Sequence, residues 1–184
     1  MDESTAFTEF NTLLAGEPPE LGPGPRAGVW PVKTINARLD ELFAAHKSSG
    51  RSRDLIRGLL LLWHDHHEPA HAIAQDDPSA DGSLLHAILH RREPDFGNAG
   101  YWFRRVGNHP SFPDLANGVA ELLNTKNEKS LLARLVRNGQ WDSFAFIREC
   151  EEAISLPPSD PRVQLMRQIQ AIESEVLLRK LTLD

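Results

Sequence analysis

Histidine is the residue type whose distribution in this 184-residue chain most clearly indicates chemistry. Seven of the eight histidines lie between residues 64 and 109. Because a helix turns by about 100° per residue, His86, His90 and Glu93 share one face of a helix. An uninterrupted helix would place a second polar set on one face, consisting of His64, His67, His71 and Gln75. Two neighbouring helices joined by a short connection can point these faces at each other.

One chemistry for these histidines is metal binding. Imidazoles at positions i and i+4 of a helix can share one ion, and a carboxylate one turn away can complete the ligand set. The sequence therefore predicts, as one alternative, a divalent zinc, iron or manganese site with the ligands His67, His71, His86 and His90, and with Glu93 as a further ligand. Such a site should bring at least three imidazole nitrogens within about 4 Å of one point.

Known metal motifs restrict this alternative. The HExxH motif is absent, and the single Glu-x-x-His motif at residues 68–71 falls short of the two that a di-iron carboxylate bundle requires. The dipeptide His64-Asp65 matches the signature of HD-type metal phosphohydrolases, with His46 and Asp95 as the outlying residues. A dipeptide has low specificity, so an HD-like enzyme is a minor alternative.

A segment that combines arginine with aromatic residues follows the second histidine set. On the short helix expected there, one face carries Asn98, Tyr101, Trp102 and Arg105, whereas Arg104 points away. Amide, phenol, indole and guanidinium groups together can hold a planar or anionic small molecule.

The leading hypothesis joins both segments in one pocket that binds a small polar or anionic ligand and acts on it by acid–base catalysis. Histidine suits this role because its pKa lies close to neutral pH. The expected catalytic residues are His86, His90 and Glu93. The expected ligand-binding residues are His71, Gln75, Arg92, Asn98, Tyr101, Trp102, Arg105 and His109. A further hypothesis is that these groups form a purely structural polar network.

The pocket hypothesis also makes a geometric prediction. Polar arcs on two helices of an otherwise apolar bundle are costly unless their groups satisfy each other. We therefore expect one shared cavity lined by His86, His90 and Arg105, with Tyr101 and Glu93 at its wall and Arg104 outside it.

The elements that must position these residues are helices. Apolar residues recur at helical spacing along nearly the whole chain, which predicts an all-α, single-domain helical bundle. Residues 17–31 contain five prolines in fifteen residues and are expected to form a long irregular N-terminal arm or loop. Pro69 should kink or split the long helix that starts near residue 52. Other helices are expected over residues 4–14, 35–50, 81–93, 98–106, 114–124, 128–138 and 141–154, and from residue 160 onward.

Composition restricts the classes of partner. A net charge of −6 argues against non-specific binding to nucleic acid or to an anionic membrane. The sequence contains no run of 18 apolar residues, so no transmembrane helix is expected. The acidic N-terminus lacks the apolar segment of a secretory signal. The single cysteine, Cys150, cannot form an internal disulfide, which predicts a cytoplasmic protein. We expect a small-molecule ligand, and the final helix is a candidate homodimer contact.

Three strings resemble an uncharacterised family of bacterial and fungal helical proteins: WHDHHEPAHAIAQ, HAILHRREPDFGNAGYWFRRVGNHP and WDSFAFIRECE. The resemblance extends from His64 to the C-terminus and implies no particular activity. The resemblance implies that the family shares the following residues: His71, Gln75, His86, His90, Arg91, Arg92, Glu93, Asp95, Asn98, Tyr101, Trp102, Arg105 and His109.

Overall fold

The structure is a computed structural model that describes residues 3–46 and 50–183. Helices dominate it, which confirms the all-α prediction. Their bounds are α1 (Glu3–Asn11), α2 (Val32–Ala45), α3 (Gly50–Trp63), α4 (His67–Asp76), α5 (Ala80–Arg92), α6 (Phe96–Val106), α7 (Phe112–Thr125), α8 (Lys129–Leu135), α9 (Ser143–Ala153) and α10 (Pro161–Leu183), with a short 3-10 helix at Thr12–Leu14.

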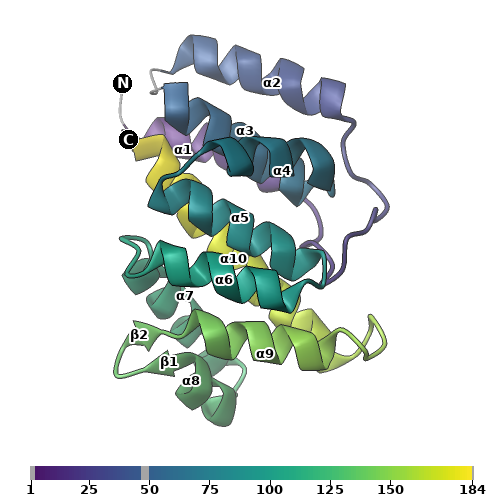
Figure 1. Ribbon diagram of the computed structural model, residues 1–184, viewed down its shortest axis with the longest axis vertical. Coiled ribbons are helices and arrows are strands. Elements are labelled where there is room, and N and C mark those ends of the chain that lie inside the picture. The colour runs from purple at the N-terminus through teal and green to yellow at the C-terminus, as the bar shows by residue number, and fades with distance from the viewer. Residues whose placement is uncertain (1–2, 47–49, 184) are drawn as a thin grey trace.

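The long helix α10 joins two apolar clusters. Its C-terminal half belongs to the same cluster as residues of α1, α2, α3 and α5, and its N-terminal half belongs to the cluster that includes α7, α8 and α9. Helix α4 packs on α5, and α5 packs on α6, so these three helices form a layer, of which α5 and α6 lie in front of α10 (Figure 1). This layer carries most of the predicted site residues.

Polar side chains define where the helices of this layer begin. The Ser79 hydroxyl accepts a hydrogen bond from the N–H of Gly82 at 3.1 Å and caps α5. The Asp95 carboxylate accepts one from the N–H of Asn98 at 3.0 Å and caps α6. Both helices therefore begin slightly earlier than the predicted starts.

The predicted long helix is split into α3 and α4. The break lies at residues 64–66, where Asp65 has a left-handed backbone with φ +63°. Pro69 falls in the first turn of α4, where backbone N–H groups have no partner within the helix, so a residue without an N–H is tolerated there. The break resets the helical phase, so the prediction that His64 shares a face with His67 is wrong. The His64 Nε2 atom instead lies 3.1 Å from the carbonyl oxygen of Leu13.

The predicted helix over 128–138 ends at Leu135, which corrects that boundary. Strand β1 (Val136–Arg137) pairs antiparallel with β2 (Gln140–Trp141), and the two residues between them, Asn138 and Gly139, have φ of +52° and +77°. Positive φ at both positions is typical of a type I′ hairpin turn, for which Asn-Gly is the preferred sequence.

The irregular arm at residues 17–31 is confirmed, and it is fastened to the bundle at two places. The Arg26 guanidinium donates to the Asp65 carboxylate at 2.8 Å. The Arg167 guanidinium donates to the carbonyl oxygen of Pro18 at 2.5 Å. These contacts tie the arm to the α3–α4 break and to α10.

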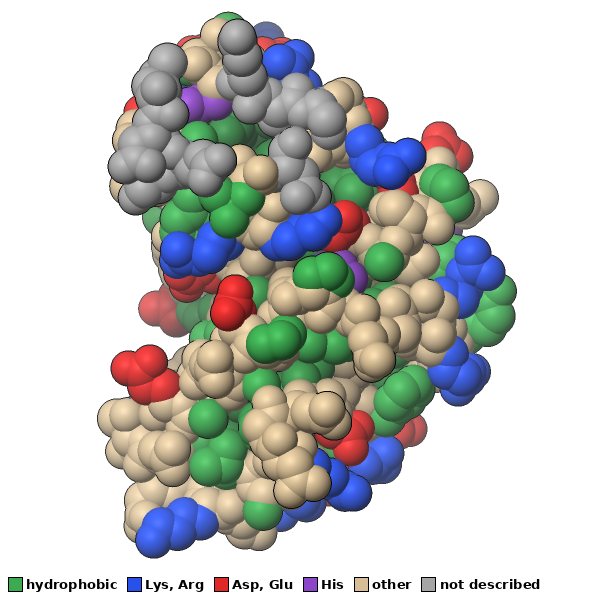
Figure 2. All heavy atoms as spheres, turned by 90° about the vertical axis from the view of Figure 1, so that its left-hand side faces the viewer, with side chains coloured by type: hydrophobic (Ala, Val, Ile, Leu, Met, Phe, Trp, Pro, Cys, Tyr) green, Lys and Arg blue, Asp and Glu red, His purple; other side chains and the backbone are tan. Residues whose placement is uncertain are grey.

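The surface is of mixed polarity on the side that carries both ends of the chain. Acidic and basic side chains alternate there with apolar and uncharged ones (Figure 2). Among the described residues, no helix combines the length and the apolar character needed to cross a membrane.

Candidate metal centre

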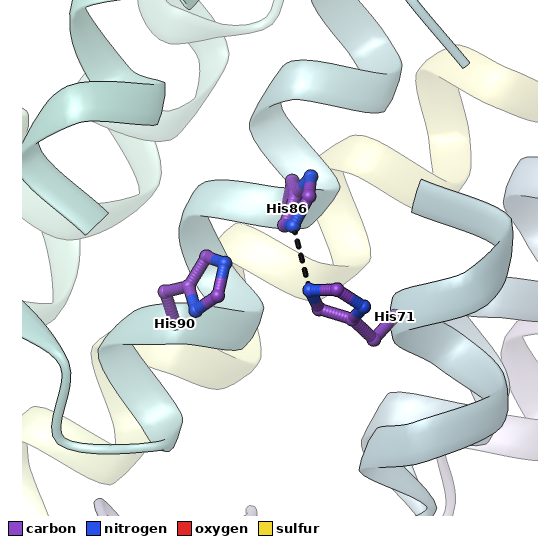
Figure 3. Close-up of side chains that lie close together, drawn as sticks. All are labelled: His71, His86 and His90. Carbon is purple, nitrogen blue, oxygen red and sulfur yellow. Dashed lines mark hydrogen bonds between the residues drawn. The ribbon is translucent and has the colours of Figure 1, made fainter. Parts of the chain in front are cut away.

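Three histidine side chains converge between α4 and α5, and we call them the His centre: His71, His86 and His90. His71 lies on α4, whereas His86 and His90 lie one turn apart on α5 (Figure 3). Each ring offers one nitrogen, and these three nitrogens all lie within 4.8 Å of one another. The predicted convergence of three imidazole nitrogens is therefore present.

The distances within the His centre suit a small cation. The Nε2 atoms of His71 and His86 are 3.0 Å apart and share a hydrogen bond. Two imidazole nitrogens bound to one tetrahedral zinc ion are about 3.3 Å apart, given bonds of about 2.0–2.1 Å. An ion can thus replace the shared proton with little movement of this pair. Because the widest spacing is at most 4.8 Å, His90 needs a side-chain movement of roughly 1–1.5 Å.

Aromatic stacking holds the central ring of the His centre in place. The His86 ring lies against the His90 ring at 4.7 Å, with an interplanar angle of 19°. It also stacks on the Trp102 indole from α6 at 3.9 Å and 21°. These contacts explain how a layer of three helices can orient a buried imidazole without many hydrogen bonds.

Two histidines of the centre, His86 and His90, have a lowered affinity for protons. Burial lowers the pKa of His86 to about 4, with smaller contributions from the neighbouring imidazoles of His90 and His71. Burial also lowers the pKa of His90, which Glu93 partly offsets. At neutral pH these rings are uncharged, so each has a nitrogen lone pair available to a metal.

Glu93 and Asn98 surround His90. The Glu93 Oε2 atom is 3.0 Å from His90 Nδ1, although the two are not aligned for a hydrogen bond, and the Asn98 Nδ2 atom is 3.1 Å from His90 Nε2. A carboxylate favours a proton on Nδ1, and an amide N–H donates to a lone pair on Nε2. We assign the Nδ1–H tautomer to His90 on these grounds. In this tautomer the ring lone pair is on Nε2, where a metal would replace the Asn98 amide, with Glu93 as an outer partner at Nδ1.

His86 lacks an equivalent outer partner. Its Nδ1 atom is buried, and no described residue forms a hydrogen bond with it. Metal-bound histidines usually donate their second N–H to a carboxylate or carbonyl, and loss of that partner costs about 10–100-fold in metal affinity. The His centre is therefore suited to an affinity well below that of the tightest zinc sites.

His67 lies next to the His centre but outside it. Its Nδ1 atom is 4.0 Å from Glu93 Oε1, and its nitrogens do not belong to the group of three. Burial lowers the pKa of His67 to about 4, and the positive charge of Arg92 makes a smaller contribution in the same direction. The structure therefore separates His67 from the other three predicted ligands.

Two predicted ligand-binding residues have structural partners instead. Arg92 is 2% exposed, and its guanidinium binds the carbonyl oxygen of Leu62 and the Asp65 carboxylate. His109 is buried between Asp81, whose Oδ1 lies 2.9 Å from Nε2, and the Ser111 hydroxyl, 2.7 Å from Nδ1. Both side chains thus make their hydrogen bonds away from the His centre, because each ties two segments of the chain together.

The predicted shared cavity with Arg105 is not formed, which is a correction. Arg105 is exposed, and its guanidinium lies over the Trp102 ring at 5.2 Å from the ring centroid. The indole stands between Arg105 and His86, since it stacks on both. Tyr101 is 48% exposed and contacts Trp102 edge-on. Gln75 is also exposed, near the C-terminal end of α4.

The HD-type arrangement is not assembled by the residues proposed for it. The carboxylate of Asp65 is fully buried between the guanidinium groups of Arg26 and Arg92. His64 stacks on Trp30 at 5.3 Å, and His46 lies 3.1 Å from Glu9. In the part of the chain that the structure describes, the His centre is the only group of three or more His, Cys, Asp or Glu side chains placed to share an ion.

The sequence did not reveal the buried ion pairs. Arg91 is fully buried against Glu173 on α10, and Asp65 pairs with two arginines from distant segments. The only available signal was the apolar surroundings of Arg91 and Arg92 on α5. In such surroundings an arginine requires a buried acid.

Comparison of the chain with protein-family models, with curated proteins and with solved structures found no match. The arguments about function therefore rest on the geometry of the His centre.

Proposed function

We propose that the protein binds one divalent transition-metal ion of the zinc type through His71, His86 and His90. The observation that supports this most directly is the convergence of three imidazole nitrogens within 4.8 Å. The lowered pKa of His86 and His90 adds support, because protons do not compete for their lone pairs at neutral pH.

Three neutral ligands would leave the full double charge on the ion and an open coordination position. Such an ion supplies Lewis-acid chemistry and lowers the pKa of coordinated water. Glu93, whose side chain is 34% exposed and lies 3.0 Å from His90 Nδ1, would act on the ion through His90, because a carboxylate at the second ring nitrogen makes the ligand more basic. These features favour a hydrolytic site over a structural zinc site, in which protein ligands normally occupy all four positions.

Calorimetric titration of the metal-free protein with zinc, together with elemental analysis after dialysis, tests the proposal. The expected result is one ion per chain with a micromolar dissociation constant, because the His86 ligand lacks an outer partner. His71→Asn, at a half-buried position, should lower the affinity at least tenfold, and His86→Ala should remove binding. His67→Gln is the matched control, since His67 lies on the same helix as His71 and outside the His centre.

Two results would count against the proposal: wild-type protein that takes up no zinc, or folded His86→Ala protein that keeps the wild-type affinity. Circular dichroism establishes that each variant is folded. Loss of binding in His67→Gln alone would move the site toward Glu93 and away from the His centre.

A second candidate function is metal-free acid–base chemistry on a small polar ligand. The hydrogen bond between the Nε2 atoms of His71 and His86 favours it, because such a pair can hold and transfer one proton. The zinc titration separates the two candidates, since only the first requires an ion.

A further inference from the structure

A groove of about 680 Å³ lies between α7 and α10, and none of its lining residues belongs to the His centre. Its lining residues extend from Asp114 to Thr125 on α7 and from Ile172 to Arg179 on α10. On both helices they recur at the spacing of a single helical face, so each helix contributes one face to the groove. At a rise of about 1.5 Å per residue, the groove follows α7 for about 17 Å, or three turns.

The floor of the groove is apolar. Leu122, Ile172 and Val176 are half-buried, because each packs against the apolar cluster that includes α7, α8 and α9 and also lines the groove. Gly118 allows the two helices to approach closely here, since a Cβ at this position would lie 2.9 Å from Cγ2 of Ile172. Apolar side chains that stay partly open along two packed helices form a surface on which the apolar face of a third helix can pack.

The rim of the groove is acidic. Asp114 and Glu121 on α7 are exposed, and over residues 3–46 and 50–183 neither carboxylate has an ion-pair partner. On α10, Glu175 lies 3.4 Å from Arg179, so this arginine is already paired. The lining side chains carry three negative charges and one positive charge. The groove therefore attracts a basic partner and repels an acidic one.

The spacing of the two unpaired carboxylates adds a geometric requirement. Glu121 follows Asp114 by seven residues, which is two helical turns or about 10 Å along α7. A partner helix that lies along the groove places its own residues i and i+7 at the same separation. Two basic side chains seven residues apart, beside an apolar stripe, would thus face both carboxylates.

We propose that this groove is the docking site for a basic amphipathic helix of another protein, of about three turns. Its apolar face would lie on Leu122, Ile172 and Val176, and two basic residues seven positions apart would pair with Asp114 and Glu121. The proposal does not depend on the metal site. A second copy of the chain fits the groove less well, because a two-fold symmetric contact would set the acidic rim against itself in a protein of net charge −6.

Two labelled synthetic helical peptides test the proposal when fluorescence anisotropy is measured against the full chain. The lysine peptide carries leucines on one face, spaced three and four residues apart, and two lysines seven residues apart beside them. The glutamate peptide has glutamate in place of both lysines. We expect the lysine peptide to bind and the glutamate peptide to bind at least about tenfold more weakly. Replacement of the leucines by alanine should abolish binding of the lysine peptide, since the rim charges alone are exposed and weak.

Variants of the protein locate the contact. Glu121→Lys should weaken binding of the lysine peptide about fivefold or more and should strengthen binding of the glutamate peptide. Glu151→Lys is the matched control, because Glu151 is exposed on α9, does not line the groove and gives the same change of net charge. It should stay within about twofold of wild type, since salt screens charges that are not in contact. Circular dichroism establishes that both variants are folded.

Several results would overturn the proposal. One is a lysine peptide that does not bind, or that binds no more tightly than the glutamate peptide. Another is an equal effect of Glu121→Lys and Glu151→Lys, which would reflect the overall charge of the protein and not the groove. Full affinity after replacement of the leucines would likewise exclude the apolar floor. Sedimentation of the protein alone tests the remaining occupant: a dimer that Glu121→Lys changes would assign the groove to a second copy of the chain.

Discussion

Replacement of Asp65 by asparagine should destabilise the protein strongly. The Asp65 carboxylate is fully buried and bridges Arg26, at 2.8 Å, and Arg92, at 2.5 Å. Burial lowers the pKa of Arg92 to about 10 even with Asp65 present, which shows how costly its charge is at this position. Without the carboxylate, Arg92 becomes a buried charge without a counter-charge. Breaking a buried pair in this way costs about 3–5 kcal/mol of the free energy of unfolding.

Asparagine is the suitable replacement because the backbone of Asp65 has φ +63°. Asparagine adopts this left-handed region readily, so the substitution changes the charge and leaves the backbone unstrained. Arg26→Ala is the comparison variant. It should cost less, about 1–3 kcal/mol, because Asp65 would remain paired with Arg92.

Urea unfolding followed by circular dichroism measures these differences, since urea does not screen charges as guanidinium chloride does. A loss below about 1 kcal/mol in Asp65→Asn would contradict the reasoning. Adding Arg92→Met to Asp65→Asn provides a second check. If the uncompensated charge of Arg92 is the cause, the double variant should be more stable than Asp65→Asn alone.

Two further predictions concern acid and the arm. The pKa of His86 and of His67 is lowered from 6.5 to about 4 in the folded protein, so the unfolded chain takes up protons first as the pH falls. The free energy of unfolding should therefore decrease between pH 6.5 and about pH 4, by at most about 1.4 kcal/mol per pH unit for each histidine. Urea titrations across this pH range measure the decrease. A stability that does not change over this window would contradict the burial of both rings. Gly24→Ala should destabilise the protein by about 1–3 kcal/mol, because φ is +79° and the added Cβ would lie 2.7 Å from Asp65 Oδ2. Gly22→Ala is the control, since its Cβ would meet nothing within 4 Å, and it should leave the stability nearly unchanged. Thermal unfolding of both variants measures the difference.

Periodicity was enough to predict most of the helices. The predicted starts of α5 and α6, residues 81 and 98, are slightly late because the caps Ser79 and Asp95 were not recognised, although a helix start depends mainly on such local hydrogen bonds. The hairpin at Asn138-Gly139 also had a local signal, but the apolar spacing favoured a helix that extends to residue 138 and a second helix that begins at residue 141.

The three members of the His centre were predicted because spacing within a helix determines which side chains share its face. The position of Arg105 was not, because it depends on how α6 rotates against α5, and Trp102 rather than Arg105 occupies the inner side. The partner of Arg92 was also beyond sequence reasoning. Asp65 reaches it only because the helix breaks at residues 64–66.

The position of α10 has a consequence for the order in which the protein can fold. Helix α10 packs on α1, and Arg167 holds the carbonyl of Pro18 across 149 residues of sequence. Contacts between such distant segments form only after the intervening chain has been synthesised. Leu177, Leu178 and Leu181 belong to the same apolar cluster as Phe7 and Phe10. Helix α1 therefore remains incompletely covered, and in need of protection from aggregation, until α10 has left the ribosome.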